Sequence, residues 1–177
     1  SSMDDDQIRS MMEMMGDLFR DGAPMTAAQA ATVILDAVKA GEWRILVGDD
    51  ESNYLVILRE LLSRDGFVVD ALNEPLEALK LAARRPFDAA LVDLRMGELD
   101  GVEVMERLHR LDPDLSVVIM TAFATVETAI DSMKRGAADY VMKPFENQDL
   151  LRILRRAASF TRLSRENRIL KQNLQSH

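Results

Sequence analysis

Five short apolar runs alternate with five amphipathic segments from residue 43 to the carboxyl end, and this order constrains the fold more than any other feature. The runs are four to six residues long, which is the length of buried strands, and each is followed by apolar residues at helical spacing. Repeated strand–helix units predict a doubly wound α/β fold, a parallel sheet with helices on both faces and right-handed crossovers. The predicted strands are 43–47, 67–71, 87–92, 115–120 and 138–141, and the predicted helices are about 52–64, 74–84, 101–110, 125–135 and 146–174.

The composition fits a globular protein and excludes several functional classes. The 177 residues are 47% hydrophobic and 29% charged, as in folded domains rather than disordered chains. A net charge of -8 argues against nucleic acid or an anionic membrane surface as the main partner. The absence of cysteine excludes disulfides and thiolate chemistry, and no apolar run approaches the roughly 20 residues that cross a bilayer. We therefore expect a cytoplasmic protein.

The first 42 residues differ in composition from the rest. They hold six of the 11 methionines, and eight acidic residues against three basic ones. The segment Gly22-Ala23-Pro24 interrupts the chain, and the Ala-rich run that follows predicts a helix over 27–40. We expect a helical extension over 1–42, a main domain over 43–148, and an extended last helix over 149–177.

Polar side chains follow the predicted strands, at the sheet edge where parallel α/β folds place their sites. Asp49 and Asp50 follow the first strand, Asp93 ends the third, and Thr121 and Lys143 follow the fourth and fifth. An acid after a strand can simply cap the next helix, but five matched positions in one topology weigh against that interpretation.

Three neighbouring carboxylates repel one another unless a cation neutralises them. Ligands that are all oxygen, without histidine, suit magnesium, although manganese could substitute. Given the metal, one aspartate could attack a phosphoryl group. Lys143 would then neutralise the phosphoryl oxygens, and Thr121 would donate a hydrogen bond to them.

These segments resemble the receiver domain of two-component response regulators, over residues 43 to about 160. The resemblance is carried by ILVGDDE at 45–51, ALVDLRMGELDG at 90–101 and VIMTAFATVETAIDSMKRGAADYVMKPF at 118–145. It implies a flavodoxin-like fold, a five-stranded parallel sheet of order 2-1-3-4-5. It also implies that a histidine kinase is the partner, and that the domain catalyses only its own phosphorylation and dephosphorylation.

The resemblance further implies a role for each site residue. Asp93 would be the residue that is phosphorylated. Asp50, Asp93 and the backbone carbonyl of Arg95 would bind magnesium directly, while Asp49 would act through water.

The resemblance also implies roles for three more residues. Thr121 and Lys143 would hold the phosphoryl group, and Tyr140 would be the aromatic switch that turns inward as Thr121 moves. The family also implies a cis peptide at Lys143-Pro144.

The sequence departs from the family pattern in two places. Gly97 follows Met96 where the family usually has proline, so we expect a looser loop beside Asp93. Gly48 stands where a branched apolar residue is common, so we expect a weaker end of the first strand. Arg95 and Phe123 occupy positions at which the family varies its rate of self-dephosphorylation, and the sequence assigns no rate.

The last predicted helix carries an apolar seam and resembles the linker of nitrogen-regulation-type sigma-54 activators. Asn167 lies on this seam, where a buried amide can fix the register of a parallel pair. A parallel coiled coil would make the protein a homodimer, although a solvated helix with a narrow stripe is the alternative because Arg156 interrupts the seam. The sequence shows no ATPase or DNA-binding segment after it, so we expect a shortened regulator or one without an output domain. The seam residues are Ile153, Phe160, Leu163, Asn167, Leu170 and Leu174.

Residues 18–50 resemble the last helix and strand of short-chain dehydrogenases. The chain has neither GxGxxG nor Tyr-x-x-x-Lys, so dehydrogenase chemistry is excluded. We therefore expect a natural or engineered chimera of two α/β proteins that shares one strand. A receiver with an unrelated acidic extension is the alternative.

The leading hypothesis is a receiver that accepts a phosphoryl group on Asp93 with magnesium and changes its dimerisation through the last helix. The alternative is a structural scaffold whose assembly does not depend on phosphorylation. A phosphatase acting on external substrates is disfavoured, because Arg95 stands where such enzymes carry a second acid.

Overall fold

The central sheet has five parallel strands in the order β2-β1-β3-β6-β7. The computed structural model describes residues 43–176, so the extension over 1–42 and its helix at 27–40 lie outside the described residues. Counted along the chain, this is the order 2-1-3-4-5, and the predicted flavodoxin-like fold is confirmed. The strands are β1 Arg44–Gly48, β2 Val68–Leu72, β3 Ala89–Asp93, β6 Ser116–Thr121 and β7 Asp139–Met142.

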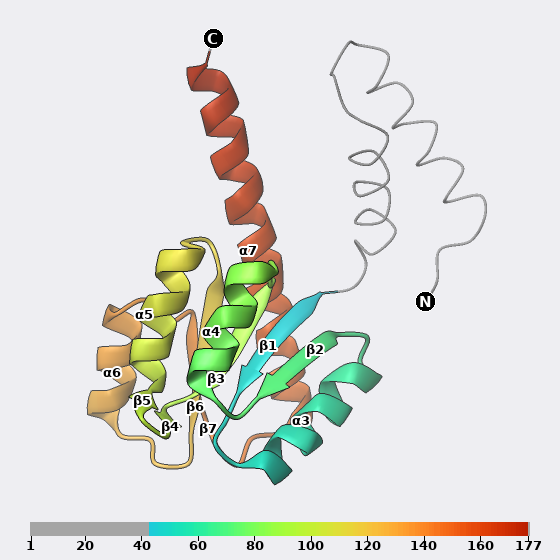
Figure 1. Ribbon diagram of the computed structural model, residues 1–177, viewed down its shortest axis with the longest axis vertical. Coiled ribbons are helices and arrows are strands. Elements are labelled where there is room, and N and C mark those ends of the chain that lie inside the picture. The colour runs from blue at the N-terminus through green and yellow to red at the C-terminus, as the bar shows by residue number, and fades with distance from the viewer. Residues whose placement is uncertain (1–42, 177) are drawn as a thin grey trace, which may run out of the picture. The chain divides into compact units, whose positions relative to one another are not determined.

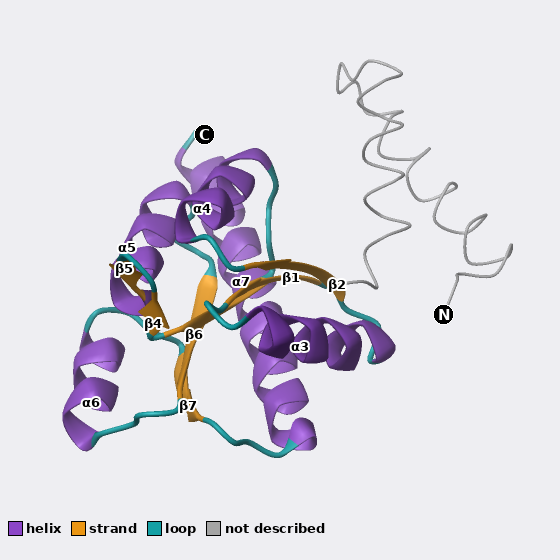
Figure 2. Ribbon diagram, turned by 60° about the horizontal axis from the view of Figure 1, so that its bottom comes forward, coloured by secondary structure: helices purple, strands orange, loops and turns teal. Residues whose placement is uncertain are grey.

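Helices cover both faces of the sheet (Figures 1 and 2). α3 and α7 pack on one face with a core that includes Ala89 and Leu91, and α4 and α5 pack on the other with Ala90 and Val92. Successive residues of β3 therefore enter opposite cores, as expected for a strand buried on both sides. The helices are α3 Ser52–Arg64, α4 Pro75–Arg84, α5 Gly101–Leu111, α6 Val126–Lys134 and α7 Asn147–Gln175.

Local signals explain why these helices begin where they do. Pro75 occupies the first turn of α4, where its missing N–H costs nothing. Asp100 caps α5 by accepting a hydrogen bond from Glu103 N at 2.8 Å. Thr125 and Thr128 form a reciprocal capping box at the start of α6. Every strand and helix predicted from residue 43 onward lies within two residues of the observed bounds.

A short hairpin between β3 and α5 has no counterpart in the predicted elements. β4 Arg95–Met96 pairs antiparallel with β5 Leu99–Asp100. Gly97 lies in the turn between them with a φ of 63°, a conformation that glycine adopts without steric cost. The expectation of a looser loop after Met96 is wrong, because a tight two-residue turn orders the backbone beside Asp93.

The structure also explains why position 48 is a glycine, and it does not show the expected weakening of β1. Gly48 pairs with both Leu72 and Val92, so β1 is not weakened at its end. A Cβ atom at this position would lie 2.9 Å from Cε of Met96, whose side chain is fully buried. The glycine therefore makes room for Met96, which anchors the hairpin in the core.

The first half of α7 is held against the sheet by apolar side chains and one hydroxyl. Leu150, Leu154 and Ala158 are buried in the core on the α3 side of the sheet. Thr161 continues the same face, is buried, and accepts a hydrogen bond at 2.9 Å from Ser116 N, the first amide of β6. Because buried backbone amides need hydrogen-bond partners and Ser116 is buried, Thr161 fixes α7 to the start of β6.

Beyond Thr161 the docking becomes ionic. Three arginines, which we call the arginine ladder, continue this side of α7 and reach aspartates in the loops that precede β3 and β6. Beyond the ladder, α7 extends past the sheet (Figure 1). None of the described helices is both long enough and apolar enough to cross a membrane. The ladder pairs are Arg162 Nε with Asp88 Oδ1 at 3.1 Å, Arg165 Nη2 with Asp112 Oδ2 at 2.5 Å and Arg168 Nε with Asp114 Oδ2 at 2.8 Å.

Candidate functional site

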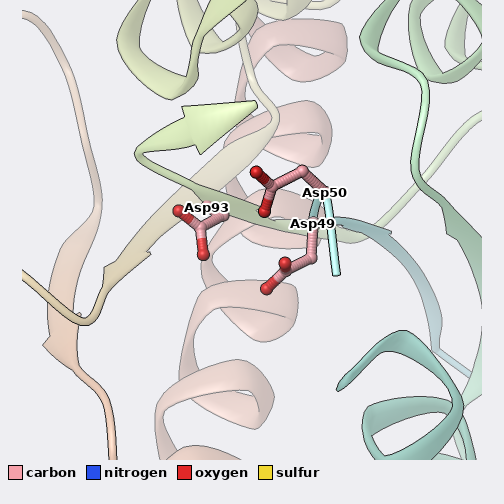
Figure 3. A group of neighbouring side chains, drawn as sticks. All are labelled: Asp49, Asp50 and Asp93. Carbon is pink, nitrogen blue, oxygen red and sulfur yellow. The ribbon is translucent and has the colours of Figure 1, made fainter. Parts of the chain in front are cut away.

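Three aspartates meet at the carboxyl ends of β1 and β3. Asp49, Asp50 and Asp93 each place a carboxylate oxygen within 4.8 Å of the others, and Figure 3 shows these carboxylates turned toward a common space. Asp49 and Asp93 are buried, whereas Asp50 is exposed. The structure thus brings together the acidic residues that the sequence places after these two strands.

Lys143 bridges the two buried carboxylates. It follows β7, and its Nζ lies 2.6 Å from Asp49 Oδ2 and 2.5 Å from Asp93 Oδ2. Its backbone N–H donates to Thr121 O at 2.8 Å, and the peptide bond to Pro144 is cis, as the family resemblance implies. The ammonium is therefore placed where it can neutralise charge on either carboxylate.

Backbone amides hold the remaining oxygens of these carboxylates. Asp49 Oδ1 accepts from Glu51 N at 2.8 Å, and Asp93 Oδ1 accepts from Arg95 N at 2.8 Å. Each buried carboxylate therefore has one oxygen on a backbone amide and the other on Lys143. This arrangement fixes the orientation of both carboxylates.

The donor set fits a small divalent cation. Three carboxylates and one ammonium leave the cluster with two net negative charges, and like charges this close favour a cation between them. The ligands are oxygens on two neighbouring strand ends, with Asp50 open to solvent. Magnesium prefers such sites because it binds few carboxylates and retains several waters.

Burial and neighbouring charges shift the pKa values of the site. Burial raises the pKa of Asp49 from 3.8 to about 6, and the bonds from Lys143 and Glu51 N oppose this rise only in part. Burial alone would lower the pKa of Lys143, but its hydrogen bonds and attraction to Asp49 and Asp93 raise it overall. Lys143 therefore stays charged at neutral pH.

We expect magnesium to bind more weakly as the pH falls through 6. Asp49 has a pKa of about 6 in the metal-free protein, so it is ionised above this pH and protonated below it. A protonated carboxyl cannot attract the cation or its waters, so proton uptake competes with binding. Titration calorimetry should show about a tenfold lower affinity at pH 5 than at pH 7. Asp49→Asn is the control and should flatten this dependence. If the magnesium affinity of the unaltered protein did not change between pH 7 and pH 5, the assignment of the pH dependence to Asp49 would be wrong.

Thr121 and Tyr140 are each hydrogen-bonded to a different partner. Thr121 ends β6, is buried, and its Oγ1 accepts from Phe123 N at 3.1 Å. The Tyr140 hydroxyl lies 2.8 Å from Oγ1 of Thr128, which belongs to the capping box of α6. The role of Tyr140 as a switch that follows Thr121 stays a prediction.

Two aromatic contacts border the site. The Arg95 guanidinium lies 4.3 Å from the centroid of the Phe123 ring, so the two positions noted in the sequence are in contact. The ring of Tyr54 lies 4.2 Å from Lys143 Nζ. Tyr54 lies inside α3 rather than directly after a strand, which is why inspection of strand ends missed it.

Comparison with known proteins gives an independent indication of the family. The family model for the response regulator receiver domain matches residues 45–155. Among curated proteins, the transcriptional regulatory protein ZraR of Klebsiella oxytoca is 40% identical over 120 residues, which are 68% of this chain and 27% of that protein. The chain thus spans about a quarter of the length of the curated relatives it matches.

Solved structures agree with this match. A receiver domain protein from Clostridium thermocellum is 31% identical with a TM-score of 0.65, covering 68% of this chain and 98% of that one. The beryllofluoride-activated NtrC4 receiver domain, solved as a dimer, is 29% identical with a TM-score of 0.64, covering 67% and 98%. These matches give no support to a dehydrogenase-like segment or a chimera, and residues 1–42 lie outside the described structure.

Proposed function

Because the chain belongs to the response regulator receiver domain family, we propose that Asp93 accepts a phosphoryl group from a histidine kinase in a magnesium-dependent reaction. Receivers of this family act as phosphoacceptors in two-component signalling. The observation that supports the assignment to Asp93 is its buried carboxylate, which lies beside Asp49 and Asp50 and within 2.5 Å of the Lys143 ammonium.

The proposed reaction is a direct transfer. An oxygen of Asp93 forms a bond to phosphorus while the bond between phosphorus and the kinase histidine nitrogen breaks, and the electron pair leaves with the imidazole. Bound magnesium would supply charge neutralisation, with Asp50, Asp93 and the Arg95 carbonyl as its ligands and Asp49 acting through water.

Lys143 and Thr121 would then hold the product. The ammonium of Lys143, which now bridges two carboxylates, would shift toward the phosphoryl oxygens because they carry more charge than the carboxylate they replace. The Thr121 oxygen accepts a bond from Phe123 N, which leaves its hydroxyl proton available for a phosphoryl oxygen.

Intact mass spectrometry tests this proposal. The chain is incubated with a small-molecule phosphodonor and magnesium, beside a sample in which a chelator removes the metal. We expect one phosphate adduct in the first sample and none in the second. No adduct in a chain that circular dichroism shows to be folded would favour the phosphorylation-independent scaffold.

The scope of the chain's activity is part of this proposal. Residues 43–148 would be the receiver and 149–177 a linker helix, with no direct binding to nucleic acid because the net charge is -8. The only reactions would be those of its own aspartyl phosphate, carried out in the cytoplasm. Arg95, two residues after Asp93, offers no acid for catalysis on an external substrate.

We also propose that two copies of the chain pair through α7. The seam residues Phe160, Leu163, Leu170 and Leu174 are between 60% and 78% exposed, so they are free to meet a second helix. The arginine ladder faces the aspartates of its own receiver, and these positions lie outside the seam in the heptad. From Phe160 onward, docking on the receiver and pairing between copies are therefore compatible, whereas the first seam residue, Ile153, packs against the core of its own receiver.

Leu170→Glu should abolish this pairing. In a parallel dimer the glutamate of one chain would be buried against the glutamate of the second chain. The free-energy cost of burying these charges exceeds the stabilisation that the leucine contact provides. Sedimentation velocity should show a dimer for the unaltered chain and a monomer for the variant. Ile169→Glu is the matched control, because Ile169 is similarly exposed at 52% but lies off the seam. Equal dissociation of both variants would contradict the seam.

A further inference from the structure

Two carboxylates and one aromatic ring lie next to the ammonium of Lys143. An ammonium carries three N–H donors. Two reach carboxylates, Asp49 at 2.6 Å and Asp93 at 2.5 Å. The third neighbour is the ring of Tyr54, whose centroid lies 4.2 Å from Nζ, well inside the range of a cation–π contact.

Tyr54 is itself held in place by the loop that carries Lys143. It comes from the first turns of α3, and its ring lies 6.3 Å from the ring of Phe145 at an interplanar angle of 60°. Phe145 follows Pro144 directly, so Tyr54 contacts both ends of the segment 143–145. The half-buried ring also borders a cavity of about 300 Å³ next to Lys143 and Ala122.

We propose that Tyr54 is a positioning residue for Lys143 in phosphoryl transfer, an inference that rests on the proposed function. The ring offers its negative face to the ammonium in addition to the two carboxylates and would limit the access of water to it. Only 12% of the Lys143 side chain is exposed, so the contact acts in a poorly solvated place, where such contacts are strongest.

In the proposed reaction the ammonium of Lys143 must lie close to Asp93 when the phosphoryl group arrives. Lys143 has a long and flexible side chain, and holding it near Asp93 costs conformational entropy. A ring that fixes the ammonium in advance lowers this cost when a phosphoryl group arrives. The binding of the phosphodonor should therefore depend on the ring of Tyr54, whereas its hydroxyl should contribute little.

A series of variants at this position tests the proposal. Tyr54→Leu removes the ring and keeps an apolar side chain, and we expect about a fivefold higher half-saturating concentration of the small-molecule phosphodonor, with a nearly unchanged maximal rate. Tyr54→Phe keeps the ring and should stay within about twofold of the unaltered chain. Val56→Ala is the control on the same helix, since Val56 is 65% exposed, and it should change neither quantity.

A double-mutant cycle separates positioning from general packing. The unfolding equilibria of the unaltered chain, Tyr54→Leu, Lys143→Met and the double variant are compared in urea without metal. Coupling of about fivefold between the two positions is expected, because each substitution removes the same contact. Independent effects would show that Tyr54 merely packs, and a half-saturating concentration unchanged in Tyr54→Leu would overturn the proposal.

The two proposals fail in different ways. If the unaltered chain gains no phosphate on Asp93, the proposed function fails, although coupling in urea would still support the contact. If the unaltered chain is phosphorylated while Tyr54→Leu and Tyr54→Phe behave alike, the receiver function stands and the role of the ring is wrong.

Discussion

Asp93→Asn should abolish the phosphate adduct. An amide oxygen is a poor nucleophile and carries no charge, so the replacement removes both the acceptor and one of the carboxylates around the cation site. The backbone bond should survive, because an asparagine oxygen can still accept from Arg95 N, as Asp93 Oδ1 now does at 2.8 Å. We expect at least about a hundredfold less adduct by intact mass, which is complete loss in practice.

Asp100→Asn is the matched control for this experiment. Asp100 ends the hairpin that follows Asp93, but its carboxylate caps α5 by accepting from Glu103 N at 2.8 Å. Asparagine caps helices about as well as aspartate, so this variant should be phosphorylated like the unaltered chain. An adduct that persists in Asp93→Asn would mean that another group accepts phosphate, and the exposed Asp50 would be the first to examine by peptide mapping.

Gly101→Ala should cause the largest loss of stability of any small substitution near the site. A Cβ at Gly101 would lie 2.2 Å from the carbonyl oxygen of Asp93 and 2.8 Å from Cα of Leu94. Both are backbone atoms, and Gly101 N is bonded to Leu94 O at 2.7 Å, so a shift would break the contact that joins α5 to the site. Urea unfolding should show a loss of more than about 3 kcal/mol.

Gly97→Ala provides the comparison. Gly97 has open space around it, but its φ of 63° is costly for any residue with a Cβ. The expected loss is about 1 kcal/mol. Equal losses in the two variants would mean that the first turn of α5 can retreat from Asp93, and that close packing there is not what requires a glycine.

Periodicity predicted the strands and helices well because both faces of the sheet are buried. A strand such as β3 is apolar up to its last residue, Asp93, and the helices need one apolar side, so the two patterns differ clearly. The strand order was inferred from the family resemblance, since periodicity carries no information on which strands are neighbours. The β4–β5 hairpin was missed because two-residue strands are too short to show a period.

The convergence of the candidate site residues could be predicted where these residues follow strands. Asp49, Asp93 and Lys143 come together as the topology requires. The effect of Gly48 on the first strand was misjudged, because Met96, which occupies the space beside it, is distant in sequence. Tyr54 was missed because it lies within a helix, where an aromatic residue usually indicates only core packing.

The arginine ladder also sets the rotational phase of α7. Each residue turns an α-helix by about 100°, and Thr161 and the ladder fix that angle at several points along the helix. An element joined rigidly to the end of α7 would therefore have a defined azimuth relative to β6. Inserting a single residue after Arg168 would turn that azimuth by about 100°, while seven residues would nearly restore it. The helix therefore sets the orientation of an element that follows it as well as the distance of that element from the sheet.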